Sequence, residues 1–257
     1  MDRMRDKTAI ITGGSGALGK TIALTLAREG ADIAIWDISV ERGQKIVDEI
    51  VGMCNRKVIF SRVDISKSKE VNAAAETVIA ELGKIDVLVN NAGVVSSAPT
   101  LLDLSDERWN LELSINLTGT FYCTRAVLKH MMDKRSGKIV NIASLAGELG
   151  RPITSAGYSS SKAGVLGFTM SVARSVAAYG INVNAVCPGI IITDIHKAYS
   201  PEQLELLQAD IPLNREGEMG VRGKPQDVAD AVLFLASKES DYVTGTRIRV
   251  NGGSLMG

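Results

Sequence analysis

The chain has few of the residues that build cross-linked or metal-bound folds. Its 257 residues include 3 cysteines and 2 histidines. Cys54, Cys123 and Cys187 are odd in number and widely separated, which argues against a disulfide framework and against a cysteine-based metal site. His130 and His196 have no spacing that pairs them as metal ligands. We therefore expect no metal centre.

An excess of charge of one sign and a long apolar run are missing as well. The 29 basic and 29 acidic residues balance, and no basic block is interleaved with aromatics, so nucleic-acid binding is not expected. No apolar run approaches the roughly 20 residues that span a bilayer. The charged residues 1–7 lack the apolar segment of a signal peptide. We therefore expect a soluble, cytoplasmic protein that does not bind membranes.

The chain does have a regular alternation of short strand-like runs with helical patterns. Such alternation indicates parallel strands joined by right-handed crossovers, an α/β fold of the doubly wound Rossmann type with a mostly parallel sheet flanked by helices. A length of 257 residues with 45% hydrophobic content is enough for a single domain covering 1–257. The expected strands are 7–12, 32–36, 58–62, 87–89, 138–141, 182–186 and 247–250.

A glycine-rich turn follows the first expected strand. Gly13, Gly16 and Gly19 precede an apolar-periodic run at 22–26, which gives strand, turn and helix. Glycines allow a close backbone approach, so that a pyrophosphate can sit on free N–H groups at the positive end of the helix. The second strand ends in Asp37, whose carboxylate can hold a ribose diol and repels a 2′-phosphate. We predict a dinucleotide site that takes NAD in preference to NADP.

Tyr158 and Lys162 are separated by one helical turn. This spacing stacks an ammonium beside a phenol and favours the phenolate. A tyrosine tuned in this way can move a proton near neutral pH. Alone, the pattern also fits a solvated polar face of a helix.

Several motifs in one order resemble the short-chain dehydrogenase/reductase family, and the resemblance covers nearly the whole chain. Each motif is short, but their joint occurrence in this order is highly specific. Ala17 stands where the family more often has glycine, and it is small enough for helix and sheet to stay close. The motifs are Thr-Gly-Gly-Ser-Gly-Ala-Leu-Gly at 12–19, Asn-Asn-Ala-Gly at 90–93, Asn116 in Ile-Asn-Leu-Thr-Gly-Thr, Ser144 in Asn-Ile-Ala-Ser, Tyr158 to Lys162, and Pro-Gly-Ile-Ile-Ile-Thr at 188–193.

The resemblance implies a catalytic group of four residues. Tyr158 would be the general base, and the acid in the reverse direction. Lys162 would lower the pKa of Tyr158 and hold the nicotinamide ribose. Ser144 would hydrogen-bond the substrate oxygen, and Asn116 would anchor a water that leads from the lysine to solvent.

The resemblance and the turn chemistry together define the cofactor residues that we expect. Asp64, with Ile65, follows a strand at the place where the family meets the adenine. A helix cap is the rival role for Asp64, but Ser66 is the better-placed cap. Lys20 and Arg42 keep NADP open as the less favoured cofactor. The expected set is Gly13, Ser15, Gly16, Leu18, Gly19, Asp37, Asp64, Ile65, Asn91, Ala92, Gly93, Tyr158, Lys162, Pro188, Gly189, Ile191 and Thr193.

The substrate residues are predicted from a loop between Ser144 and Tyr158. Arg151 could grip an anionic substrate in a two-pronged geometry, with Glu148 beside it. The alternative is a surface ion pair between Arg151 and Glu148. His196 could line the substrate entrance. The segment from about 194 to 223 has the composition of a mobile lid.

These residues lead us to expect NAD-dependent oxidation of a secondary alcohol on a polyol, sugar or sugar acid. The Glu-Leu-Gly-Arg loop resembles that of gluconate 5-dehydrogenase-like members. The alternative is a 3-oxoacyl-acyl-carrier-protein reductase using NADPH, which is similar in length and in the Val-Asn-Gly-Gly pattern at 250–253. Those enzymes often carry a basic residue where this chain has Tyr179.

A non-catalytic dinucleotide-binding sensor is the expectation of a different class, and the presence of all four catalytic residue types disfavours it. The resemblance also implies a homotetramer. A stripe of Val165, Phe168 and Val172 would pack either across a two-fold axis or into the protomer's own sheet.

Overall fold

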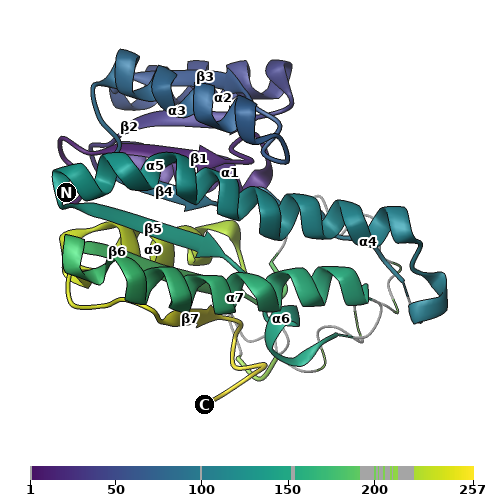
Figure 1. The fold of residues 1–257 in the computed structure, drawn as a ribbon. Helices are drawn as coiled ribbons and strands as arrows, with labels where there is room; N and C mark the ends of the chain where they lie inside the picture. The colour runs from purple at the N-terminus through teal and green to yellow at the C-terminus, as the bar shows by residue number, and fades with distance from the viewer. Residues whose placement is uncertain are drawn as a thin grey trace.

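Seven strands form the central sheet of the computed structural model (Figure 1). The structure describes residues 2–98, 100–151, 154–191, 200, 202, 205, 209, 211–213 and 223–257. The strands are β1 (Thr8–Thr12), β2 (Asp32–Asp37), β3 (Val58–Arg62), β4 (Val87–Asn90), β5 (Gly137–Ile142), β6 (Ile181–Pro188) and β7 (Arg247–Val250).

The strands lie in the order β3-β2-β1-β4-β5-β6-β7, and every neighbouring pair is parallel. From β1 the chain winds outward to β3 and then crosses back to β4 on the other side of β1. This order is that of a doubly wound nucleotide-binding fold. The fold class predicted from the alternating pattern is confirmed.

Helices connect the strands. Between β4 and β5 the chain forms α4, a π-helical segment at Ser114–Gly119, and α5. Short 3₁₀ turns lie at Leu101–Asp103, Ala177–Tyr179 and Lys238–Ser240. The helices are α1 (Ala17–Arg28), α2 (Val40–Cys54), α3 (Ser68–Leu82), α4 (Asp106–Leu113), α5 (Thr120–Lys134), α6 (Ala146–Leu149), α7 (Ala156–Val176) and α9 (Pro225–Ala236).

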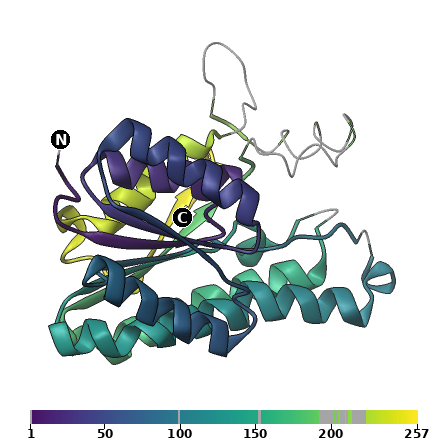
Figure 2. The same cartoon turned by 90° about the horizontal axis from the view of Figure 1, so that it is seen from above.

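The helices cover both faces of the sheet. α1, α2 and α9 lie on one face, and α3, α5 and α7 lie on the other (Figure 2). Ile11 and Ile35 join the core under the first group, whereas their strand neighbours Ile10 and Trp36 join the core under the second. Side chains of a strand alternate between faces, so a sheet covered on both sides needs apolar residues at successive positions. Within the described ranges, no helix is both long and apolar enough to cross a membrane.

Candidate active site

Those expected site residues that the structure describes gather at one edge of the sheet. All strands are parallel, so their carboxyl ends meet at this edge, and ligands of such sheets bind where the strand order reverses. Here the reversal lies between β1 and β4. The glycine-rich turn follows β1, and Asn91, Ala92 and Gly93 follow β4, so the two predicted cofactor loops flank the switch point.

The glycine-rich turn has no room for side chains at two positions. Gly13 has a φ of +61°, and a Cβ on it would stand 2.7 Å from the Cα of Ala92. A Cβ on Gly19 would stand 2.3 Å from the carbonyl oxygen of Gly13. These contacts are shorter than any relaxed packing allows. The glycines therefore let the turn, the loop after β4 and the first turn of α1 lie against one another.

The N-terminus of α1 is suited to an anion. Gly16 is its N-cap residue and offers no side-chain hydrogen bond, and the first turn contains no acidic residue. The first N–H groups of a helix have no intrahelical acceptor, and the helix dipole adds positive potential. Leu18, in this turn, packs against the core of its face and so fixes how the helix begins.

Asp37 stands beside the glycine-rich turn. Its Oδ2 accepts the backbone N–H of Ser15 at 3.0 Å, and its Oδ1 accepts that of Ser39 at 3.0 Å. The carboxylate is half-buried at the carboxyl end of β2, next to the helix start. Lys20 forms an ion pair with Glu49 at 2.7 Å, which directs its ammonium toward α2.

Thr12 and Asn91 join the two cofactor loops. The Oγ1 of Thr12 accepts the N–H groups of Asn91 and Ala92, both at 3.0 Å. The side-chain amide of Asn91 donates to the carbonyl oxygens of Thr12 at 2.9 Å and Gly13 at 3.1 Å. Asn91 therefore holds the turn in place, and sequence reasoning missed the part that the Thr12 hydroxyl plays in this.

Asp64 and Ile65 follow β3 on the same edge. Asp64 Oδ1 accepts from both the N–H and the hydroxyl of Ser66, at 3.0 and 2.6 Å, and these bonds lower the pKa of Asp64. The prediction that Ser66 caps the next helix is wrong. α3 begins at Ser68 with Lys67 as its N-cap residue, and the Ser66 hydroxyl donates to Asp64 instead. Ile65 is buried in the core.

Tyr158 and Lys162 lie on one face of α7, which the side chain of Ser155 caps by accepting the N–H of Tyr158 at 3.0 Å. Lys162 is 4% exposed, and its Nζ donates to the carbonyl oxygen of Ile142 at 2.7 Å. The Nζ lies 5.8 Å from the centre of the Tyr158 ring. Burial lowers the pKa of the Lys162 ammonium to about 8.

Asn116 sits in the π-helical segment and is fully buried. Its Oδ1 accepts the N–H of Val94 at 2.8 Å, and its Nδ2 donates to the carbonyl oxygen of Val94 at 2.9 Å and to the Ser161 hydroxyl at 3.0 Å. One-turn π-helical insertions are frequent at functional sites. Asn116 thus binds the loop after β4 to α7, next to Lys162.

Ser144 follows β5 by two residues. Its Oγ accepts the N–H of Ala146 at 3.1 Å, which leaves the hydroxyl proton as a donor. Pro188 ends β6, and its carbonyl oxygen accepts the N–H of Leu145 at 2.9 Å. The N–H of Gly189 donates to the carbonyl oxygen of Val250 at 2.9 Å. The loops after β5 and β6 are thereby tied to each other and to β7.

Ile191 is buried and forms a parallel bridge with Gly223. Thr193 and His196 lie outside the described residues, as does most of the segment expected to form a lid.

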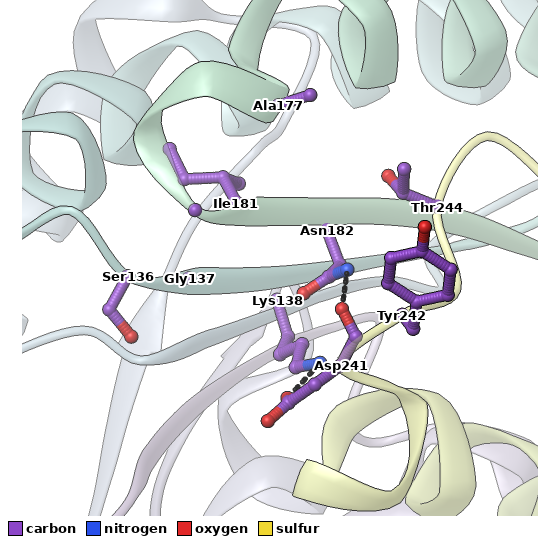
Figure 3. Close-up of a pocket in the computed structure, with 10 residues that line it drawn as sticks. Ser136, Gly137, Lys138, Ala177, Ile181, Asn182, Asp241, Tyr242 and Thr244 are labelled. Carbon is purple, nitrogen blue, oxygen red and sulfur yellow. Dashed lines mark hydrogen bonds and ion pairs between the residues drawn. The ribbon is translucent and has the colours of Figure 1, made fainter.

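A cavity of 490 Å³ opens at the opposite edge of the sheet (Figure 3). It lies where β5 and β6 begin, whereas the residues described above lie where the strands end. Lys138 pairs with Asp241 at 2.8 Å across its wall, and the Asn182 amide donates to the backbone carbonyl oxygen of Asp241 at 3.0 Å. This cavity is therefore separate from the candidate site.

Comparison with known protein families shows to which family the chain belongs. The model of the short chain dehydrogenase family matches residues 7–204. The chain belongs to the short-chain dehydrogenase/reductase family. The resemblance read from the motifs is confirmed, and the protein is an oxidoreductase of a family that uses a nicotinamide dinucleotide.

Relatives and solved structures support membership of the short-chain dehydrogenase/reductase family over the full length. The chain is 38% identical over 248 residues to 3-oxoacyl-(acyl-carrier-protein) reductase FabG of Chlamydia trachomatis, covering 96% of this chain and 97% of the relative. It is 39% identical over 254 residues to the protein of the same name from Staphylococcus aureus, covering 97% and 98%. A short-chain type dehydrogenase/reductase from Mycobacterium marinum superposes with a TM-score of 0.91 at 32% identity, covering 99% of this chain and 97% of that chain.

The residues of this short-chain dehydrogenase/reductase fit the dinucleotide that the family implies. The turn at Gly13 and Gly19 brings backbone N–H groups close without side chains in the way. The carboxylate of Asp37 lies next to that turn. The chain thus has a cradle for an anionic group, and beside it a carboxylate that can accept hydrogen bonds from hydroxyl groups.

Among the described residues, the ion pairs of Glu148 are with arginines other than Arg151, the partner considered for it. Its carboxylate, with its side chain 6% exposed, pairs with Arg247 at 2.7 Å and Arg249 at 2.6 Å on β7. Burial alone would raise the pKa of Glu148, but the hydrogen bonds from the two arginines lower it below its ordinary value. Arg151 is half-buried just after α6, and its carbonyl oxygen accepts the N–H of Thr154 at 3.3 Å.

Two residues near the N-terminus of α7 escaped sequence reasoning. Ser155 caps α7, a role that a serine just before a helical pattern signals. Glu112 of α4 is 1% exposed and accepts the Ser155 hydroxyl at 2.5 Å. An acid between Leu111 and Leu113 gives only a weak signal in the sequence, because its partners come from distant segments.

Proposed function

We propose that the protein interconverts a 3-oxoacyl thioester and the corresponding 3-hydroxyacyl thioester. The observation that carries this proposal is the similarity, over nearly the full length of both chains, to relatives named 3-oxoacyl-(acyl-carrier-protein) reductase. It replaces the polyol or sugar-acid substrate expected from the loop at Glu148. That expectation rested on a local resemblance, and the Glu148 carboxylate is occupied by Arg247 and Arg249.

Tyr158 is the proposed proton donor in ketone reduction and the base in alcohol oxidation. The nicotinamide, when bound, supplies or accepts the hydride. Lys162 favours the phenolate of Tyr158, because an ammonium 5.8 Å from the ring centre stabilises negative charge on the phenol. Ser144 donates its hydroxyl proton to the substrate oxygen, where negative charge develops. Asn116 holds the loop at Val94 against α7 and is the proposed anchor of the proton path to solvent.

NAD(H) is the proposed cofactor. A carboxylate at Asp37 accepts hydrogen bonds from free ribose hydroxyls and repels a 2′-phosphate. NADPH is the alternative, and Arg42 is the basic group that would favour it. The Nε of Arg42 donates to the Ser39 hydroxyl at 3.1 Å, and the Ser39 N–H donates to Asp37. The side chain of Arg42 alone could therefore compensate for the negative charge of Asp37.

Oxidation of a small polyol or sugar acid with NAD is the second candidate. Arg151 favours it, because this half-buried residue lies in the chain between Ser144 and Tyr158 and a guanidinium can pair with a carboxylate. The Arg151→Ala variant separates the two candidates. It would weaken the apparent affinity for an anionic sugar acid and leave turnover of a 3-oxoacyl thioester unchanged.

A homotetramer in the cytoplasm is the proposed working form. Of the predicted stripe, Val165 is buried in the protomer's own core, whereas Phe168 is half-buried and packs edge to face against the exposed Phe121 of α5. An apolar face of α5 and α7 remains for a second copy. Three free cysteines suit a reducing compartment. Light scattering coupled to size-exclusion chromatography would give the mass of the assembly, and a monomer would contradict this proposal.

The test of the proposed function is a two-direction assay with both cofactors. Oxidation of NADH and of NADPH is followed with acetoacetyl-CoA, and reduction of NAD and of NADP is followed with a panel of polyols and sugar acids. Turnover of the thioester with NADH supports the proposal. Turnover of sugar acids alone favours the second candidate. Binding of NADH without turnover of any substrate would favour a non-catalytic dinucleotide-binding sensor.

A further inference from the structure

Glu112 is a buried carboxylate whose partners are all neutral donors. Its side chain lies in α4, which runs beside α7 (Figure 1). Oε1 accepts the N–H of Ser96 at 2.7 Å and the Ser96 hydroxyl at 2.8 Å, and Oε2 accepts the Ser155 hydroxyl at 2.5 Å. None of the ion pairs among the described residues includes Glu112. Burying a charge without a counter-charge is costly. At Glu112 three hydrogen-bond donors compensate for this cost.

Ser155 connects this carboxylate to Tyr158. The Ser155 oxygen accepts the N–H of Tyr158 at 3.0 Å, so its own proton has to go to another acceptor, and Glu112 is that acceptor. Ser155 is fully buried, which excludes bulk water as a substitute. The orientation of the cap, and with it the first turn of α7, therefore depends on the Glu112 carboxylate.

Glu112 also fixes the segment that follows Gly93. Besides its two bonds to Glu112, Ser96 accepts the N–H of Ser155 with its carbonyl oxygen at 3.2 Å, and Ser97 pairs with Thr154 in an antiparallel bridge. One carboxylate thus joins α4, the loop after β4 and the start of α7.

Gly157 shows how closely α4 and α7 approach at this point. A Cβ on Gly157 would stand 2.5 Å from Oε2 of Glu112 and 3.4 Å from the Cα of Trp109. Glycine is therefore needed one residue before Tyr158 to let the carboxylate reach Ser155. The contact constrains the backbone on the N-terminal side of Tyr158.

We propose that Glu112 is a positioning residue for Tyr158. It acts through Ser155 to set the place of the phenol relative to Lys162 and to the loop after Gly93. This inference rests on the proposed function, because it concerns the residue proposed to transfer the proton.

The Glu112→Gln variant is a sharp test because it keeps size and shape but cannot satisfy all the donors. With its amide oxygen toward Ser96, the NH₂ group faces a Ser155 hydroxyl that needs an acceptor. With the amide flipped, the NH₂ group faces the two donors of Ser96. Either way a buried donor is left without a partner. Displacement of a reacting group by about 1 Å reduces turnover up to about a hundredfold.

The experiment compares kcat, the Kd of NADH measured by its fluorescence, and the melting temperature of the full-length protein. For Glu112→Gln we expect kcat to fall by about tenfold to a hundredfold, with the Kd of NADH within about twofold of the parent. Ser155→Ala should behave in the same way, and Ser155→Thr should retain kcat because it keeps both the acceptor and the hydroxyl proton. Glu107→Gln, at an exposed position of the same helix, is the matched control.

Parental kcat in both Glu112→Gln and Ser155→Ala would overturn the proposal. A loss of kcat and of NADH affinity in proportion to a lowered melting temperature would also overturn it, because it would indicate general damage rather than positioning. The Tyr158→Phe variant distinguishes failure of the proposed function from failure of the role proposed for Glu112. If Tyr158→Phe remains active, the proposed function fails. If it is inactive while Glu112→Gln is normal, only the role of Glu112 fails.

Discussion

The Nζ of Lys162 donates a hydrogen bond to the carbonyl oxygen of Ile142 at 2.7 Å in the interior of the protein. Ile142 is the last residue of β5, two positions before Ser144. The bond thus ties the proposed catalytic helix to the strand that carries the proposed substrate-binding serine. The ammonium of Lys162 has little solvent around it, so its charge is poorly stabilised. Burial therefore lowers the pKa of Lys162 to about 8.

The lowered pKa of Lys162 predicts a pH dependence of stability. The unperturbed value is 10.5, so between about pH 8 and 10.5 the folded chain binds fewer protons at this site than the unfolded chain. The free energy of unfolding contributed by Lys162 therefore rises with pH in this window, by up to about 1.4 kcal/mol per pH unit. In denaturant unfolding of the cofactor-free proteins, the free energy of unfolding of the parent should rise with pH across this range relative to that of Lys162→Met. Lys129→Met, at an exposed lysine, should show no such change relative to the parent; a pH-independent difference for Lys162→Met would contradict the burial of its charge.

Replacing Asp37 should change the choice between the two cofactors. In Asp37→Asn the side chain can still accept the Ser15 N–H, but the charge that repels a 2′-phosphate is gone. We expect the ratio of NADPH to NADH dissociation constants to fall about tenfold or more, which corresponds to about 1.4 kcal/mol. Fluorescence titration of both cofactors measures the ratio. Asp48→Asn on the exposed side of α2 is the control, and an unchanged ratio in Asp37→Asn would remove the basis for proposing NAD.

The glycine-rich turn should not tolerate a methyl group at Gly19. In Gly19→Ala the Cβ would press on the Gly13 carbonyl oxygen, so the turn must open. We expect the Kd of NADH to rise about tenfold or more and the protein to lose about 1–3 kcal/mol of stability. Gly52→Ala is the matched control. Nothing lies within 4 Å of its Cβ position in α2, and alanine there should stabilise the protein by about 0.5–1 kcal/mol. Parental NADH binding by Gly19→Ala would contradict the proposed cradle.

The Glu148 pairs should contribute stability that is lost in acid. The pKa of Glu148 lies below its ordinary value, so the stabilisation is complete above about pH 4.5 and disappears as the pH falls through the folded-state pKa. At neutral pH, Glu148→Gln should cost about 2 kcal/mol, between the values for exposed and fully buried ion pairs. The difference from the parent should shrink below about pH 4.5. A difference that persists in acid would indicate lost packing instead of lost charge pairing.

The strands could be predicted from the sequence because a doubly covered parallel sheet needs continuous apolar runs. The run at Val58–Arg62 matches β3 residue for residue, and the Tyr158 to Lys162 spacing correctly indicated a helix. The π-helical segment around Asn116 was not predicted, because the hydrogen-bond partners of Asn116, Val94 and Ser161, lie far from it in the sequence. For the same reason the sequence could not assign partners to Glu112 or Glu148, whose donors come from segments far away in the chain.

The most direct test of the central proposal is the rate of acetoacetyl-CoA reduction by NADH in the parent and in Tyr158→Phe at saturating cofactor. Phenylalanine keeps the ring beside Lys162 and removes the hydroxyl. A proton transfer of this kind contributes about 10²–10⁴-fold to the rate, so kcat should fall by that factor while NADH still binds. A Tyr158→Phe variant with parental kcat would contradict the assignment of Tyr158 as the acid and base of the reaction.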